Sequence, residues 1–227
     1  MNTRPLSLMW EIRRPPDENE RDPDWLVQVT EMRGQVLYAG GRRPQFRGAD
    51  DSCVDRDWLD RYAYHVLLRD SNMLIGCIRV VPLRNVRCCL TEFLLRDRPF
   101  EQLLTWLGNG RDRVGEVGRW VVAPEYAPFR MGLRLAIAAG VLAKQLGLET
   151  IIAMVGTRDG QARTLMRAGG QRVPGLAPVR SQTYDDDLVV LTFDLSRPAN
   201  AITLLAAEMT ARLSIEREDK VWESCSA

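Results

Sequence analysis

The sequence has no long hydrophobic run, and this absence limits where the protein is expected to act. The N-terminal stretch over residues 1–22 contains no apolar segment long enough for a signal peptide. Apolar stretches elsewhere are well short of the roughly 20 residues that a membrane-spanning helix needs. Hydrophobic residues nevertheless make up 45% of the 227 residues, enough for a sizeable core. We therefore expect a soluble, folded, cytoplasmic protein.

The chain also lacks an excess of either charge, with 31 Lys and Arg against 30 Asp and Glu. A net charge of +1 gives no bulk attraction to nucleic acid or to an anionic membrane. We expect neither a nucleic-acid partner nor a membrane span, and any function that needs positive charge must depend on a local patch.

Residues that bind metals are scarce and poorly spaced for a metal site. His65 is the only histidine, and the adjacent Cys88 and Cys89 have no matching second pair, so no zinc site is indicated. An odd number of cysteines without a spaced framework indicates reduced thiols rather than disulfides. The five are Cys53, Cys77, Cys88, Cys89 and Cys225.

The order of expected secondary-structure elements predicts a mixed α/β fold. Residues 14–24 are Pro-rich and charged, which indicates a linker, and residues 25–38 have the apolar spacing of an amphipathic helix. Two β-branched and aromatic runs, 62–69 and 73–83, predict a hairpin. Further along we expect helices at 100–107, 131–146, 159–168 and 199–215, and strands at 114–122, 150–155 and 188–195. This order implies one mixed, twisted sheet with helices on its faces.

We divide the chain into an N-terminal segment and linker (1–24), one domain (25–215) and a polar C-terminal tail (216–227). Within the domain, the strand–helix–strand run over 114–155 requires a right-handed parallel crossover. The strands at 114–122 and 150–155 should therefore run parallel and then splay apart.

Charged residues inside expected strands are the main indication of a functional site. Arg79 lies in an otherwise apolar strand, where a guanidinium needs a carboxylate partner or open water. Glu116 and Arg119 raise the same question, because residues three apart face opposite sides of a strand unless a bulge intervenes. Two interpretations stay open: a structural ion-pair network, or a polar pocket that orients a substrate and manages a proton. Either way, Arg79, Glu116 and Arg119 should cluster with Asp57 or Asp60.

These short segments together resemble a known family. Asp57-x-x-Asp60, the run GCIRVVP around Arg79, and EVGRWVV with Glu116 and Arg119 are similar in order and spacing to the autoinducer (acyl-homoserine-lactone) synthases. They also resemble the long-chain N-acyl amino acid synthases.

The resemblance spans roughly residues 25–175 and implies a GNAT acyltransferase fold. It further implies transfer of a fatty acyl group to the amine of a small molecule, from the thioester of an acyl carrier protein or of coenzyme A. The site residues it implies are Arg33 on the first helix, Asp57, Asp60, Arg79, Glu116 and Arg119. We add His65, whose position after the Asp pair places it near the same pocket.

The segment after the first helix departs from the family. GQVLYAGGRRPQF contains Tyr38 and Phe46 but no Trp at the family's usual aromatic positions. This difference favours an amino acid or another small amine over S-adenosylmethionine as the acceptor.

The expected donor loop departs from the coenzyme A pattern as well. Acetyl-CoA-dependent relatives present backbone N–H groups of a Gly-rich turn to a pyrophosphate at a helix N-terminus. Here the turn reads Ala127-Pro-Phe-Arg130-Met-Gly132, in which Pro128 lacks an N–H and Arg130 stands where Gly is expected. A phosphopantetheine arm carries one phosphate, which Arg130 or Arg134 could meet as a charge. The turn favours a carrier protein, and a degenerate loop that still binds coenzyme A is the open alternative.

The mechanism we expect is direct attack of the amine on the thioester carbonyl, with no metal and no permanently bound cofactor. Glu116 is the expected base, and Arg79 and Arg119 would hold an acceptor carboxylate or orient Glu116. Backbone N–H groups near Val121 and Val122 would bind the thioester oxygen.

The basic residues Arg158, Arg163, Arg167 and Arg172, which recur over one expected helical segment, are candidates for docking an acidic carrier protein. Two rival functions remain: an acetyl-CoA-dependent N-acetyltransferase of the same fold, and a non-catalytic acyl-binding module.

Overall fold

The computed structural model describes residues 7–17, 19, 21–41, 44–48 and 51–196. The helix expected over 199–215, the tail at 216–227 and Cys225 lie outside the described residues. The described part of the chain contains no helix that is long and apolar enough to cross a membrane.

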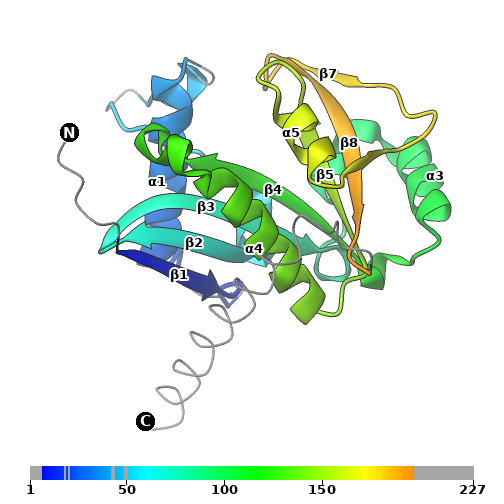
Figure 1. The fold of residues 1–227 in the computed structure, drawn as a ribbon, viewed down its shortest axis with the longest axis horizontal. Coiled ribbons are helices and arrows are strands. Elements are labelled where there is room, and N and C mark those ends of the chain that lie inside the picture. Colours follow the sequence, from blue (N-terminus) through cyan, green and yellow to red (C-terminus); the bar gives the residue numbers. More distant parts are fainter. Residues whose placement is uncertain (1–6, 18, 20, 42–43, 49–50, 197–227) are drawn as a thin grey trace, which may run out of the picture.

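One mixed sheet of eight strands runs through the molecule in the order β1-β2-β3-β4-β5-β8-β6, with β7 paired to β8 (Figure 1). The strands are β1 (Leu8–Arg13), β2 (Tyr64–Asp70), β3 (Met73–Pro82), β4 (Val114–Val122), β5 (Thr150–Gly156), β6 (Gln171–Arg172), β7 (Val179–Ser181) and β8 (Asp186–Asp194). The sequence therefore predicted the fold class and the central strands correctly.

Helices cover both faces of this sheet. The helices are α1 (Asp24–Ala39), α2 (Leu90–Leu95), α3 (Asp97–Leu107), α4 (Met131–Gln145) and α5 (Gln161–Arg167). Because strand side chains alternate between faces, Val66 and Leu68 of β2 pack in the cluster that contains α4, whereas Leu67 packs in the cluster that contains α1. The runs at 62–69 and 73–83 are hydrophobic throughout because both of their faces are covered.

The junction between β4 and β5 is the feature of the sheet that matters for the site. The two strands are parallel, as expected, but they pair only at Val114–Thr150, Gly115–Ile151 and Glu116–Ile152. Beyond Glu116 no further pair is formed, while β5 continues to pair with β8 as far as Gly156. The sheet is therefore split between the carboxyl-terminal parts of β4 and β5, which confirms the predicted splay.

Four of the strands and helices were not predicted from the sequence: β1, α2, β6 and β7. β1 pairs antiparallel with β2 along the edge of the sheet, so residues 8–13 belong to the sheet rather than to a segment preceding the domain. α2 has only six residues, too few to show a helical period, and it begins with a capping box formed by Cys89 and Glu92. β6 and β7, of two and three residues, are also too short to give a pattern.

Candidate active site

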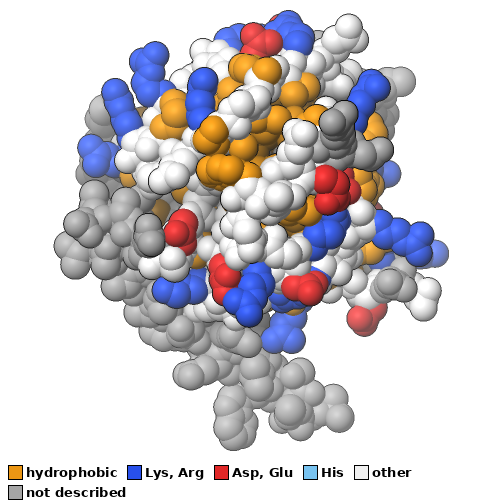
Figure 2. Space-filling model, turned by 90° about the vertical axis from the view of Figure 1, so that its right-hand side faces the viewer, with side chains coloured by type: hydrophobic (Ala, Val, Ile, Leu, Met, Phe, Trp, Pro, Cys, Tyr) orange, Lys and Arg blue, Asp and Glu red, His pale blue; other side chains and the backbone are white. Residues whose placement is uncertain are grey.

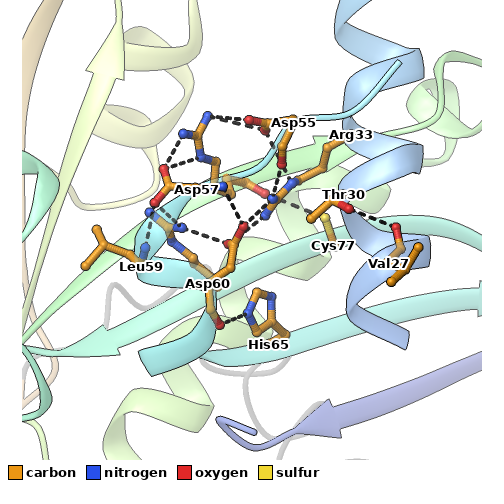
Figure 3. A network of polar contacts seen from close by, with 11 residues as sticks. Val27, Thr30, Arg33, Asp55, Asp57, Leu59, Asp60, His65 and Cys77 are labelled. Carbon is orange, nitrogen blue, oxygen red and sulfur yellow. Dashed lines mark hydrogen bonds and ion pairs between the residues drawn. The ribbon is translucent and has the colours of Figure 1, made fainter. Parts of the chain in front are cut away.

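Three arginines and three aspartates meet on the face of the sheet that α1 covers (Figure 3). The arginines come from three separate elements: Arg33 from α1, Arg79 from β3 and Arg119 from β4. The aspartates, Asp55, Asp57 and Asp60, all come from the short segment that ends in the 3₁₀ helix η2 (Trp58–Tyr62). We call these six residues the ion-pair network.

Local chemistry fixes the aspartate segment in place. Asp57 caps η2 by accepting the N–H of Leu59 at 2.9 Å, and Asp60 accepts the N–H of Asp57 at 3.2 Å. The segment also lies directly on α1, since a Cβ atom on Gly34 would come within 2.4 Å of the Cys53 carbonyl oxygen. Only glycine at position 34 permits this approach, which brings Asp55 beside Arg33.

Asp60 is the centre of the network. Its carboxylate accepts hydrogen bonds from both terminal nitrogens of Arg33, from Nη1 at 2.9 Å and from Nη2 at 2.5 Å, in a bidentate pair. Nη1 of Arg79 donates to Asp60 at 2.8 Å and lies 3.0 Å from Asp57. The side chains of Arg33, Arg79 and Asp60 are at most 3% exposed, so this is a buried array of charge.

Arg119 joins the network because β4 contains a bulge. The register between β3 and β4 shifts between Cys77–Val121 and Arg79–Gly118, so that Arg119 and Trp120 lie opposite the single residue Ile78. Arg119 has a φ of 53°, in the left-handed region. Its Nε donates to Asp57 at 2.9 Å, and its Nη1 lies 3.2 Å from Asp55. The bulge thus turns Arg119 to the same face as Arg79, as the spacing required.

The ion pairs offset the cost of burial. Burial alone would raise the pKa of Asp57 and Asp60, but Arg79 with Arg119, and Arg33 with Arg79, hold both values below the usual range. Burial opposes the charged form of Arg33 and Arg119 too, yet Asp60, Asp55 and Asp57 hold their pKa values above the usual range. Asp57, Asp60, Arg33 and Arg119 therefore stay charged near neutral pH.

Glu116 has different partners from those predicted. It is buried, and its carboxylate accepts the N–H of Thr91 at 2.6 Å and that of Leu90 at 3.3 Å at the start of α2. Neither Arg79 nor Arg119 bonds to it. The predicted cluster of Arg79 and Arg119 with the aspartates is confirmed, whereas Glu116 stands apart because the unpredicted α2 supplies its donors. Burial and the neighbouring Glu116 raise the pKa of Cys89, which keeps that thiol protonated.

A cavity of about 920 Å³ lies in the split between β4 and β5. Glu116, Gly118 and Arg119 line it from β4, and Met154 lines it from β5. It continues along the inner side of α4 and towards α5, where its walls are mainly apolar. Of the network, only Arg119 lines this cavity. Asp55 and Asp57 contact Arg119 directly, and Arg33 and Arg79 pair with these two aspartates in turn.

A second cavity of about 810 Å³ lies between the start of α4 and α5, and it shares Trp120, Val121 and Leu133 with the first. The predicted donor-binding residues Val121, Val122, Arg130 and Gly132 all line it, whereas Arg134 lines neither cavity. Arg130 has a φ of 58°. The backbone therefore adopts the conformation that glycine favours, although the residue is arginine.

His65 is part of the core rather than of a cavity. It is fully buried, its Nε2 lies 2.9 Å from the Asp60 carbonyl oxygen, and its ring makes an edge contact with Trp25. A carbonyl can only accept, so Nε2 carries the proton. Burial lowers the pKa of His65 to about 4, which keeps the ring neutral.

Asp55 and Tyr184 were not predicted from the sequence. Asp55 lies two residues before the motif that drew attention to Asp57. Tyr184, in the turn between β7 and β8, lines the main cavity, and the Arg119 guanidinium lies 5.9 Å from the centre of its ring. Burial raises the pKa of Tyr184, so its hydroxyl stays protonated. A residue in a tight turn gives no periodic signal in the sequence, so Tyr184 could not be predicted as a site residue. Only the fold places it beside Arg119 of β4.

The basic residues proposed for docking do not share one helix. Arg163 and Arg167 lie in α5, whereas Arg158 precedes it and Arg172 lies in β6. All four are exposed, and Arg158 pairs with Asp185 at 3.1 Å. Figure 2 views the side of the molecule on which α3 and β7 lie, and it shows basic side chains around a central area of hydrophobic ones.

Comparisons with known proteins agree with this architecture. Residues 35–136 match the acetyltransferase (GNAT) domain family. BjaI, a CoA-dependent acyl-homoserine lactone synthase solved with SAM and isopentyl-CoA, superposes with a TM-score of 0.62 at 18% identity, covering 89% of each chain. The AHL synthase LasI superposes at 0.54 with 17% identity, over 84% of this chain and 91% of its own.

FeeM, an N-acyl amino acid synthase from uncultured soil microbes, superposes with a TM-score of 0.51 at 12% identity, over 84% of this chain and 93% of its own. At these identities the likeness establishes the fold. A search of curated protein sequences found no match.

Proposed function

From the GNAT acetyltransferase domain that this chain contains, on the fold shared with acyl-homoserine lactone synthases, we propose an N-acyltransferase. It moves a fatty acyl group from a thioester to the amine of a small molecule. The observation that carries the proposal is the pair of adjoining cavities at the split between β4 and β5, the larger of which is lined by Glu116 and Arg119.

The acceptor amine enters on the Glu116 side of the split. An ammonium must lose a proton before its nitrogen attacks, and Glu116 takes that proton directly or through a water. The N–H groups of Leu90 and Thr91 fix the direction of the Glu116 carboxylate. The amine nitrogen then attacks the thioester carbonyl, the C–S bond breaks, and the thiolate leaves with a proton from the new ammonium centre.

Arg79 does not bind the acceptor in this proposal, because it lines neither cavity and Asp57 and Asp60 hold it. Its role is to position the aspartates that hold Arg119. Arg119 reaches the cavity and fits a polar group of the acceptor. We favour an amino acid or another small amine as acceptor, in line with the fold shared with FeeM, an N-acyl amino acid synthase.

The donor arm occupies the second cavity. Val121 and Val122 line it from the part of β4 that no longer pairs with β5, so their strand has free backbone groups for the thioester and pantetheine amides. Arg130 is exposed at the mouth of this cavity and meets the phosphate of a phosphopantetheine arm. An acyl carrier protein is the donor we favour, with acyl-CoA as the alternative.

An extract test decides whether the chain makes an N-acyl product. Cells that overproduce the chain should accumulate new N-acyl compounds detectable by mass spectrometry. Cells that produce Glu116→Gln to the same level should not, because the amide cannot accept the proton while the side-chain shape is kept. Equal product from Glu116→Gln would reject Glu116 as the base, and no product from the native chain would favour a non-catalytic acyl-binding module.

A further inference from the structure

We propose that Gly140 sets how long an acyl chain the main cavity accepts, and that the chain it admits is a long one. This inference rests on the proposed function and deepens it. The cavity runs along one side of α4, where Leu133, Gly140 and Lys144 all line it, and Leu133 also lines the second cavity proposed for the donor arm.

Glycine at position 140 leaves space that any other residue would fill. Among the described residues, the nearest atom to a Cβ built on Gly140, outside its own helix backbone, is Cδ2 of Leu195 at 3.9 Å. Glycine in a helix interior is less favourable than alanine, and filling a cavity would add apolar contacts. The empty space beside Gly140 therefore costs stability and is explained by a ligand that occupies it.

The position of Gly140 along α4 gives an approximate limit on the length of the acyl chain. Seven residues at about 1.5 Å each place Gly140 about 10 Å beyond Leu133, roughly the length of an extended eight-carbon chain. Lys144 lies about 6 Å further, which adds roughly five carbons. Lys144 and Asp194, which line the far end, are exposed, so among the described residues no apolar wall closes the cavity there.

The wall around Gly140 has the chemistry of an alkyl site. Ile137 and Val141 line the cavity from α4, Phe193 lines it from β8, and Leu195 lines it from just after that strand. Each methylene group that such a wall removes from water strengthens binding roughly fourfold. A bulky side chain at 140 would bar the carbons beyond about the eighth and leave shorter chains untouched.

The test compares hexanoyl and tetradecanoyl thioesters, with the native chain, Gly140→Ala and Gly140→Phe. We expect Gly140→Phe to lower the ratio of kcat/KM for the C14 donor to that for the C6 donor at least tenfold. Gly140→Ala adds one methyl group and should change this ratio by less than about threefold. If Gly140→Phe does not fold, as judged by thermal unfolding, Gly140→Leu replaces it with the same expectation.

A binding arm separates this inference from the proposed function. S-hexyl-CoA and S-tetradecyl-CoA are thioethers that cannot transfer an acyl group, and calorimetry with each variant measures their affinity. Loss of the C14 advantage in Gly140→Phe supports the inference even if no acyl transfer is found with any amine. An unchanged C14-to-C6 ratio in a folded Gly140→Phe protein overturns it, whatever the fate of the transferase activity.

Discussion

At the scale of a single residue, Arg79 shows which contacts could be predicted from the sequence. An arginine in an apolar strand must find a carboxylate, and the sequence offered Asp57 and Asp60 before it, so their contact could be predicted from burial cost alone. The partners of Glu116 could not be predicted, because they are backbone N–H groups of α2, a helix too short to be recognised from its sequence. Tyr184 and Asp55 were also missed, because neither breaks an apolar pattern.

We predict that Arg79→Met destabilises the protein by about 3–5 kcal/mol, because it leaves Asp57 and Asp60 short of a buried cation. Urea unfolding followed by circular dichroism measures the change. Arg113→Gln is the control, since its pair with Glu149 is exposed on both sides and is worth at most about 1 kcal/mol. A loss no larger than that of the control would show that the network contributes little to stability.

His65 makes stability depend on pH in acid. Its pKa in the folded protein, about 4, lies below the unfolded value of about 6.5, so the unfolded state binds the proton more readily. The stability from neutral His65 is complete above pH 6.5 and is lost as the pH falls towards 4. Between pH 7 and pH 5 the native chain should lose about 2 kcal/mol more than His65→Gln does. Parallel curves for the two proteins would show that His65 titrates normally.

At the scale of elements, strands and helices longer than about six residues were predicted from their periods and ends. The parallel crossover from β4 through α4 to β5 was predicted from the right-handedness of such connections. A bulge in β4 was the condition under which Arg119 and Glu116 could face the same side of the sheet. β1 was missed because it has only six residues and lies beside a Pro-rich stretch. The splay of β4 and β5 was predicted, but the residue after which they stop pairing, Glu116, was not, because no local pattern encodes it.

The turn before α4 carries the prediction for donor binding. Arg130→Glu should raise the KM for an acyl-carrier-protein donor by more than it lowers kcat, because it repels a phosphate at the mouth of the second cavity. Arg130→Gly is the matched control: it removes the charge without reversing it and relaxes the positive φ. Its KM should lie between those of the native chain and Arg130→Glu. A fall in kcat with unchanged KM would instead place Arg130 in the chemical step.

At the scale of the whole molecule, net charge near zero leaves recognition to local surfaces, and we propose the exposed arginines in and beside α5 as such a surface. Exposed Arg163, which lines neither cavity, fits an acidic carrier protein by charge. The sequence identified these arginines but placed them on one helix, whereas the fold distributes them over α5 and its two flanks.

The central claim is tested most directly by purified protein, a small amine and one fatty acyl group supplied in turn on carrier protein and on coenzyme A. Mass spectrometry follows the N-acyl product, and a thiol assay follows donor consumption. We predict product from both donors, with a higher kcat/KM for the carrier form that Arg163→Glu reduces. An equal or better kcat/KM with acyl-CoA would contradict our interpretation of the donor turn. Release of thiol without any N-acyl product, from either donor, would contradict the transferase itself.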